Sequence, residues 1–183
     1  MKIAQRAVRA QPFHAMSIGA RARELESRGI RIAKLSLGEP SFGAPPGVHE
    51  AMRATMDGRA LPYTPAAGLP ALRRAVAGLY RTRHGVDVDP RRVLITAGAS
   101  AGLLLATALT TEAGDDVVMA DPCYPCNREL VDTFGGRVVL APTTPAARYQ
   151  LDLATALAAW TERTSAVQVA TPSNPTGTTI PFP

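Results

Sequence analysis

Residues 115–142, "DDVVMADPCYPCNRELVDTFGGRVVLAP", alternate between apolar runs and a helical segment, and this alternation predicts the fold class. The first apolar run, residues 115–120, predicts a strand, residues 126–136 predict a helix, and residues 137–142 predict a second strand. Short apolar runs separated by helices indicate parallel strands that are buried on both faces. The stretch therefore predicts an α/β sheet with right-handed crossovers.

The same alternation continues on both sides of this stretch. Strands are predicted at residues 92–98 and 165–173, and helices at 99–114 and 151–160. Towards the N-terminus the spacing of apolar residues and the Gly and Pro punctuation predict helices at 14–29, 48–58 and 69–85, and a short strand at 32–37. The expected fold class is α/β, a mainly parallel sheet flanked by helices. Because the sequence stops soon after its last strand, we expect the sheet to be incomplete through truncation.

Composition and charge limit the possible partners. The 183 residues are 46% hydrophobic and carry a formal net charge of +5, with basic residues that are scattered rather than clustered. Scattered charge is typical of solvated helix faces, so no nucleic-acid partner is expected. The N-terminus lacks a signal-peptide pattern, and the apolar run at 103–109 is too short to span a bilayer. A cytoplasmic protein without a membrane partner is expected.

Both cysteines of the chain lie in "CYPC", residues 123–126. A thioredoxin-like redox site also lies between a strand and a helix, so that interpretation stays open. A zinc site needs further ligands, and the three histidines, His14, His49 and His84, have no paired spacing, so no metal is expected. The alternative is that the cysteines are free thiols that pack as small hydrophobic residues.

Two strand ends carry small or polar residues. In "ITAGASAGLLLA", residues 95–106, the turn from strand to helix brings backbone N–H groups to a helix N-terminus, which favours an anion such as phosphate. The alternative is a tight turn capped by Ser100. In "SNPTG", residues 173–177, Asn174 follows a predicted strand at the edge where α/β proteins bind ligands. The alternative there is an ordinary Asn-Pro turn.

Together these motifs resemble the class I/II aminotransferases that use pyridoxal 5'-phosphate (PLP), the family of aspartate aminotransferase. The resemblance covers nearly the whole chain. It rests on "LSLGEPSF" (35–42), "YTPAAGLPALRRAV" (63–76), "ITAGASAGL" (95–103), "DPCYPCNRELVDTFGG" (121–136) and "SNPTG" (173–177).

The resemblance implies a role for each matched residue in cofactor binding. Gly98, Ala99 and Ser100 are expected to hold the PLP phosphate. Tyr124 is expected to stack on the pyridine ring, and Asn174 to form a hydrogen bond with the phenolic oxygen. On this interpretation "CYPC" is the ring-stacking loop and its cysteines are bystanders.

The resemblance also implies a partner and a division into domains. Gly38 is expected beside the substrate carboxylate, and Tyr63 is expected to reach the phosphate bound by the other subunit of a homodimer. Residues 1–45 are expected to belong to the small domain and the substrate edge, and residues 46–183 to a partial PLP-binding large domain.

The catalytic group is missing from this sequence. In the family, the Schiff-base lysine, the aspartate at the pyridinium nitrogen and the arginine that binds the substrate carboxylate follow "SNPTG". The only lysines here, Lys2 and Lys34, match no family motif. We therefore expect an N-terminal part of an aminotransferase, inactive alone, that acts on amino acids and 2-oxo acids when complete. A PLP-dependent C–S lyase, a non-catalytic remnant module and a thiol oxidoreductase are the alternatives.

Overall fold

The computed structural model describes residues 2–181. It divides into two compact units, which we describe separately. The first, here called the sheet unit, comprises residues 96–183 with residues 1–13, and the second, the helical unit, comprises residues 14–95. The predicted division near residue 45 concerns the domains of a complete aminotransferase, and it stays a prediction.

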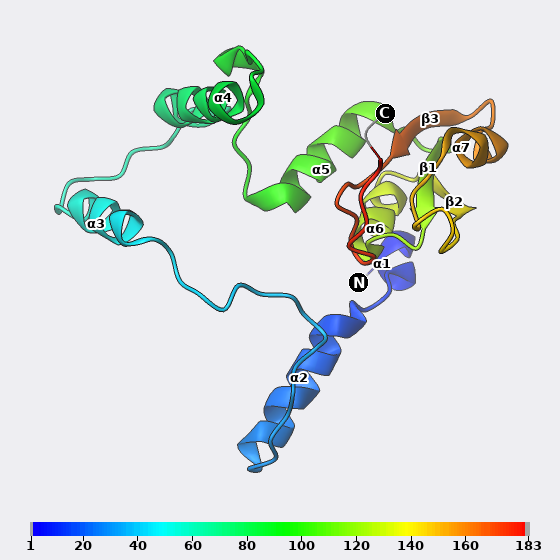
Figure 1. Cartoon of the computed structure of the whole chain (residues 1–183), viewed down its shortest axis with the longest axis horizontal. Helices are drawn as coiled ribbons and strands as arrows, with labels where there is room; N and C mark the ends of the chain where they lie inside the picture. Colours follow the sequence, from blue (N-terminus) through cyan, green and yellow to red (C-terminus); the bar gives the residue numbers. More distant parts are fainter. Residues whose placement is uncertain (1, 182–183) are drawn as a thin grey trace. The chain divides into compact units, whose positions relative to one another are not determined.

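The sheet unit is built on three parallel strands (Figure 1). They are β1 (Asp116–Asp121), β2 (Arg137–Pro142) and β3 (Thr164–Gln168), in the order β2-β1-β3. In the register, Val118 of β1 is paired with Val139 of β2 and with Val167 of β3. The parallel α/β sheet predicted from the apolar runs is confirmed.

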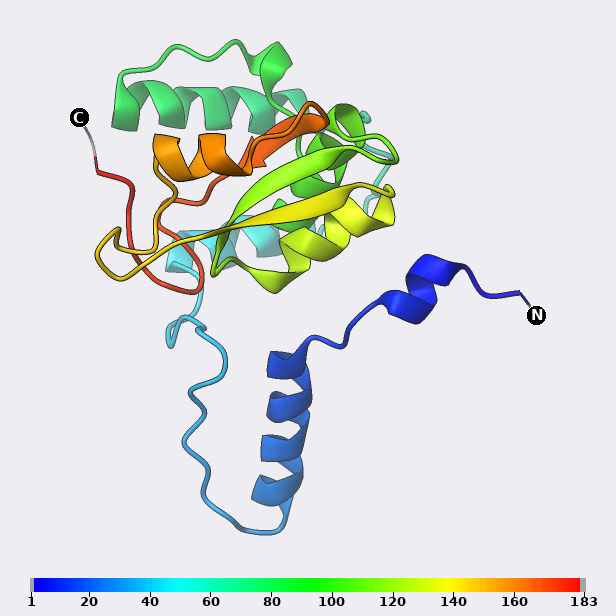
Figure 2. The same cartoon turned by 90° about the vertical axis from the view of Figure 1, so that its right-hand side faces the viewer.

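The helices of the sheet unit are α1 (Gln5–Arg9), α5 (Gly98–Thr110), α6 (Pro125–Thr133) and α7 (Leu153–Ala159). Helix α6 begins with Pro125, whose fixed φ suits a first helical turn. Helix α7 begins after Asp152, whose carboxylate accepts a hydrogen bond from the Thr155 N–H at 2.7 Å. In Figure 2, α6 lies below the strands, and α7 lies above β1 and β2.

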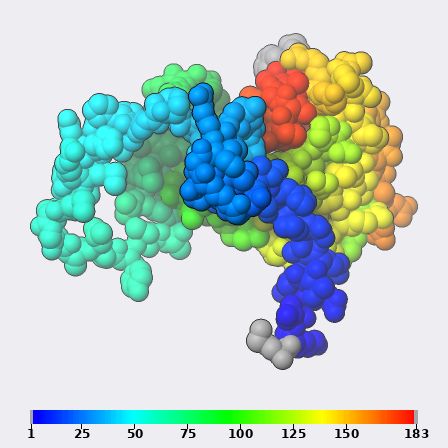
Figure 3. Space-filling view, turned by 90° about the horizontal axis from the view of Figure 1, so that it is seen from below, coloured from blue at the N-terminus to red at the C-terminus, as the bar shows by residue number. Residues whose placement is uncertain are grey.

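The core of the sheet unit lies between β1 and the helices beside it. Val117, Val118 and Met119 are buried on the strand, together with Val131 of α6 and Ala141 of β2. Burial of side chains that point to both faces of β1 is expected of a central parallel strand. Figure 3 shows the yellow and orange segments of this unit closely packed against each other. The loops at both ends of β1 are therefore held on a rigid base.

The helical unit contains α2 (His14–Ser27), α3 (Pro46–Thr55), α4 (Pro70–His84) and the short 3-10 helix η1 (Pro90–Arg92). These confirm the predicted helices. The Arg73 guanidinium joins α4 to η1, because its Nε donates to the carbonyl oxygens of Pro90 at 3.1 Å and Val93 at 2.8 Å. Among the described residues of this unit only Ala22, Gly68 and Ala77 are buried, so its apolar surface is largely uncovered.

Two predicted strands are not formed. The predicted strands at residues 32–37 and 92–98 have no strand partner among the residues that the structure describes. Val93 is extended, and the Ile95 N–H donates to the Ala67 carbonyl oxygen at 3.1 Å. A strand needs a neighbouring strand to form its hydrogen bonds, so these two apolar runs were not enough to form strands.

Among residues 2–181, none of the helices combines the length and the apolar character that a membrane span requires.

Candidate functional site

Tyr124 lies at the carboxyl end of β1, where the loop of residues 122–124 enters α6. It is the N-cap residue of that helix, and Pro125 follows it in the first turn. Its ring makes an edge-to-face contact with Phe13, with centroids 5.9 Å apart and an interplanar angle of 78°. The T-shaped contact with Phe13 and the N-cap position of its backbone hold Tyr124 at the end of the sheet.

Asn174 lies in the loop that follows β3. A tight turn shapes this loop: the Ser173 N–H donates to the Thr178 carbonyl oxygen at 2.8 Å, and the Gly177 N–H donates to the Ser173 carbonyl oxygen at 2.7 Å. Gly177 has a φ of +68°, which glycine adopts without strain. The turn leaves the side chain of Asn174 exposed beside the sheet.

The two loops border one depression, here called the strand-end hollow. It is lined by Met119, Ala120, Pro122, Cys123, Tyr124, Asn127, Tyr149, Gln150, Leu151, Gln168, Val169, Ala170, Ser173 and Asn174. The structure thus brings Tyr124 and Asn174, predicted from separate motifs, to the same place. The carboxyl ends of parallel strands are where α/β folds bind ligands.

Gly98, Ala99 and Ser100 form the first turn of α5 and do not line the strand-end hollow. The N-cap residue is Ala97, which makes no side-chain cap hydrogen bond, so the alternative of a turn capped by Ser100 is not observed. The φ of Gly98 is +81°, and all three residues are exposed. The Gly98 N–H donates to the Thr96 carbonyl oxygen at 2.8 Å. The next N–H groups of the first turn lack intrahelical acceptors, as in any α-helix, so this turn is suited to bind an anion.

The cysteines flank Tyr124 without forming a disulfide. Burial raises the pKa of Cys123, which outweighs the opposite effect of Arg128. A hydrogen bond with Cys126 and burial raise the pKa of the Tyr124 phenol. A thiol whose pKa is raised is protonated at neutral pH and is a poor nucleophile, so Cys123 is unsuited to thiol chemistry.

The opposite, amino end of the sheet holds a buried carboxylate. Asp116 has no solvent-exposed surface, and Arg137 donates to both of its oxygens at 2.7 Å. The Thr161 hydroxyl donates a third hydrogen bond at 2.6 Å. The hydrogen bonds from Arg137 and then from Thr161 lower the pKa of Asp116 to about 2. This group ties together β1, β2 and the loop before β3.

Comparison with known proteins places these features in a family. A family model described as aminotransferase class I and II matches residues 30–183. The chain is a class I/II aminotransferase family member. The resemblance deduced from the motifs is confirmed.

Relatives of this aminotransferase chain extend well beyond it. The valine–pyruvate aminotransferase of Mycobacterium tuberculosis is 42% identical over 170 residues, which cover 93% of this chain and 44% of the relative. A probable aspartate/prephenate aminotransferase of Thermus aquaticus is 34% identical over 179 residues, which cover 98% of this chain and 47% of the relative. The chain therefore spans less than half the length of the curated relatives that it matches.

Solved aminotransferase structures agree with the fold. An aminotransferase from Mycobacterium tuberculosis superimposes with a TM-score of 0.92 at 41% identity, over 99% of this chain and 46% of that one. The aspartate aminotransferase from Thermus thermophilus with maleate gives a TM-score of 0.89 at 31% identity, over 96% of this chain and 46% of that one.

Gly38 and Tyr63 of the aminotransferase chain belong to the helical unit. Gly38 lies in an exposed loop, and a Cβ added there would have nothing within 4 Å. The Tyr63 side chain is fully exposed. Nothing in the helical unit itself tests their expected roles towards substrate and partner subunit, so these roles stay predictions.

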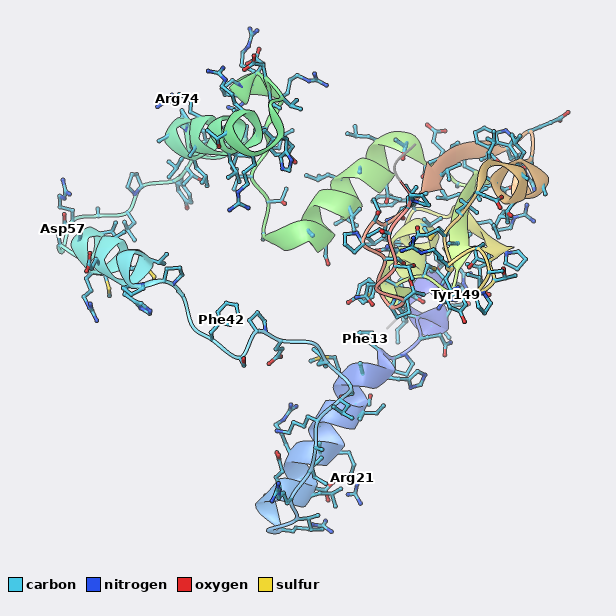
Figure 4. The ribbon with its side chains drawn as sticks, viewed as in Figure 1. Phe13, Arg21, Phe42, Asp57, Arg74 and Tyr149 are labelled. Atoms are coloured by element: carbon cyan, nitrogen blue, oxygen red, sulfur yellow. The ribbon has the colours of Figure 1, made fainter. Side chains whose placement is uncertain are left out.

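Sequence reasoning missed the segment after β2. Tyr149, Gln150 and Leu151 line the strand-end hollow, and Figure 4 labels Tyr149 there. These residues could have been predicted from the topology alone, because the loop after each parallel strand begins at the same edge of the sheet. No motif marks these residues. Arg148 and Tyr149 both have a φ of +54°. Non-glycine residues rarely adopt this conformation, so nothing in the sequence indicates it here.

Proposed function

We propose that this chain is the cofactor-binding N-terminal part of a PLP-dependent aminotransferase. The main support for the proposal is that Tyr124 and Asn174 both line the strand-end hollow, in a chain that belongs to the class I/II family. A ligand there has a flat aromatic partner and an amide donor. Those groups match a planar ring that carries a phenolic oxygen.

Each residue contributes binding or orientation. The face of Tyr124 stacks on the pyridine ring, and the Asn174 amide donates a hydrogen bond to the phenolic oxygen. The first N–H groups of α5, at Gly98 to Ser100, bind the phosphate. PLP, when bound, supplies the electron sink for moving an amino group between an amino acid and a 2-oxo acid.

The reaction itself needs residues that this sequence does not contain. Lys2 and Lys34 are its only lysines, and neither lies among the residues of the strand-end hollow. We therefore expect the 183-residue chain to bind PLP but not to turn over. The relatives named above are aminotransferases, which favours amino transfer over elimination. Valine and pyruvate are the first substrate pair to assay with a complete protein.

The helical unit supports an assembly larger than one copy of this chain. Its apolar side chains are widely exposed, with Leu35 94%, Phe42 80% and Leu61 87% accessible. Folded proteins normally cover apolar surface of this extent. We propose that further polypeptide of the enzyme, including a second subunit reached by Tyr63, packs on this unit. Gly38 then contributes to the substrate edge.

Equilibrium dialysis of the purified chain against PLP tests the proposal. We expect saturable, reversible binding that Tyr124→Leu and Asn174→Leu each weaken by about tenfold, the loss expected for a stacking contact or a hydrogen bond. Tyr80→Leu is the matched control, because Tyr80 lies on α4 of the helical unit. Its affinity should equal that of the wild type.

Reaction of PLP with amines must be separated from binding at the site. Lys2 and Lys34 offer two side-chain amines, and borohydride reduction followed by peptide mass spectrometry locates any adduct on them. The Lys2→Arg, Lys34→Arg double variant should retain the dialysis signal. Loss of that signal, or equal affinities for Tyr124→Leu and the wild type, contradicts the proposal.

A further inference from the structure

The segment between β2 and α7 is attached to both loops of the strand-end hollow. At its start, Thr143 donates two hydrogen bonds to the Asp121 carbonyl oxygen, from its N–H at 3.0 Å and from its hydroxyl at 2.7 Å. Asp121 is the last residue of β1 and precedes the loop that carries Tyr124. The segment is therefore fixed at one end to the Tyr124 loop.

At its other end the segment reaches the turn that carries Asn174. The Gln150 Nε2 donates to the Thr178 carbonyl oxygen and to the Thr178 hydroxyl, each at 2.8 Å. Gln150 is only 7% exposed, although it is polar. Figure 3 shows the red C-terminal loop lying beside the yellow segment that follows β2. Both hydrogens of the Gln150 amide are thus used on one residue of the turn.

Thr178 is the residue on which the turn closes. Its carbonyl oxygen also accepts the Ser173 N–H at 2.8 Å, and its hydroxyl lies 2.8 Å from the Thr176 hydroxyl. Asn174 lies inside this closure, next to Ser173. Replacing Gln150 therefore weakens the hydrogen bonds that hold the turn at Thr178. The position of Asn174 depends on that turn, although Asn174 itself is unchanged.

The backbone before Gln150 is held in an uncommon conformation. Arg148 and Tyr149 have a φ of +54°, and non-glycine residues adopt this region only at a cost. Hydrogen bonds from the Tyr149 N–H to Thr144 at 2.9 Å and from the Gln150 N–H to Ala147 at 3.0 Å maintain it. This conformation places the Gln150 side chain against the turn.

We propose that Gln150 is a positioning residue that holds the turn of residues 173–178 so that Asn174 faces the strand-end hollow. The consequence for PLP rests on the proposed function, whereas the effect on the turn does not. Gln150 influences PLP binding through the position of Asn174.

Two variants remove the donor. Gln150→Met keeps the length of the side chain without a polar group, and Gln150→Glu keeps its shape but offers Thr178 only acceptors. We expect hydrogen exchange in the peptide of residues 171–181 to become about tenfold faster in both, because two partly buried hydrogen bonds are lost. Gln5→Met is the matched control, since Gln5 is exposed on α1, and it should leave exchange unchanged.

A second readout separates positioning from a general loss of structure. In a double-variant cycle, Gln150→Met should weaken PLP binding several-fold when Asn174 is present and have no further effect in Asn174→Leu. A merely structural role would weaken binding equally in both backgrounds. Equal weakening, or an unchanged affinity in Gln150→Met, overturns the positioning role.

The outcomes distinguish this inference from the proposed function. If the wild-type chain binds no PLP, the proposed function fails, and the exchange measurement still decides whether Gln150 holds the turn. Unchanged exchange in Gln150→Met refutes the inference whatever the cofactor does. If Gln150→Met does not fold, Thr178→Val removes one of the two acceptors and should show a smaller increase in exchange of the same peptide.

Discussion

The two ends of β1 use polar side chains in different ways. At the amino end, Asp116 is buried, and its hydrogen bonds join the strands to each other. At the carboxyl end, Tyr124 and Asn174 line a hollow and are available to a ligand. Within one parallel sheet, the buried polar groups at the amino end join the strands, whereas the polar groups at the carboxyl end remain accessible for the binding role proposed above.

Asp116→Ala is expected to have the largest effect on stability. It removes the buried acceptor that the Thr161 hydroxyl shares with the Arg137 guanidinium, although the Arg137 side chain itself is 57% exposed. We expect the Tm from circular dichroism to fall by on the order of 10 °C. Asp132→Ala is the matched control, because Asp132 pairs with Arg9 at the surface, and its Tm should hardly change. Equal losses in the two variants would show that the amino end has no special role.

Acid should affect the amino end through the same carboxylate. The pKa of Asp116 in the folded state, about 2, lies below its ordinary value of 3.8, so its stabilisation is present above pH 4 or so and is lost as the pH falls towards 2. A plot of Tm against pH should therefore fall steeply in this window. The slope should be smaller for Asp116→Ala, and an identical slope would contradict the assignment.

Gly136→Ala tests the packing beside the amino end. An added Cβ would lie 2.6 Å from Thr111 Cγ2 and 2.9 Å from Val131 Cγ1, inside the core. We expect the free energy of unfolding to fall by about 1–3 kcal/mol in a urea titration. Gly47→Ala is the matched control, because Gly47 is in α3 with nothing within 4 Å of its added Cβ. It should be neutral or slightly stabilising.

Tyr124→Leu should show the reverse behaviour, with the smallest effect on stability. Its ring makes a T-shaped contact with Phe13, but the side chain forms no ion pair. We expect the Tm to change by only about 3 °C or less while PLP affinity falls about tenfold. A large loss of Tm would mean that Tyr124 serves the fold as Asp116 does, and the contrast between the two ends would disappear.

The sequence predicted the three strands and the helices α5, α6 and α7 of the sheet unit because their signals are local, whereas α1 (Gln5–Arg9) was not predicted. The apolar runs of β1 and β2 and the Pro125 start of α6 each lie within a few residues. Tyr124 and Asn174 were found through motifs at strand ends. Their meeting at one hollow followed from the rule that parallel strands end at the same edge.

Other features depend on contacts between residues far apart in the chain. Asp116 meets Arg137 and Thr161, and Gln150 meets Thr178, and no spacing rule connects such pairs. The predicted strand at 92–98 failed for a related reason, since its apolar run lacks a partner strand among the described residues. A strand is stabilised by hydrogen bonds to a second segment, so the apolar pattern of one segment cannot show whether the strand forms.

An amide chemical-shift map of the isotope-labelled chain, recorded with and without PLP, is the most direct test of a cofactor site at the carboxyl end of the sheet. If PLP binds at the carboxyl end of the sheet, the amide signals of Tyr124, Asn174 and the first turn of α5 should shift when it is added. Asp116 and Arg137, at the amino end, should be unchanged. Shifts confined to the amino end or to the neighbourhoods of Lys2 and Lys34, with none at Tyr124 and Asn174, would contradict a cofactor site at the carboxyl end of the sheet.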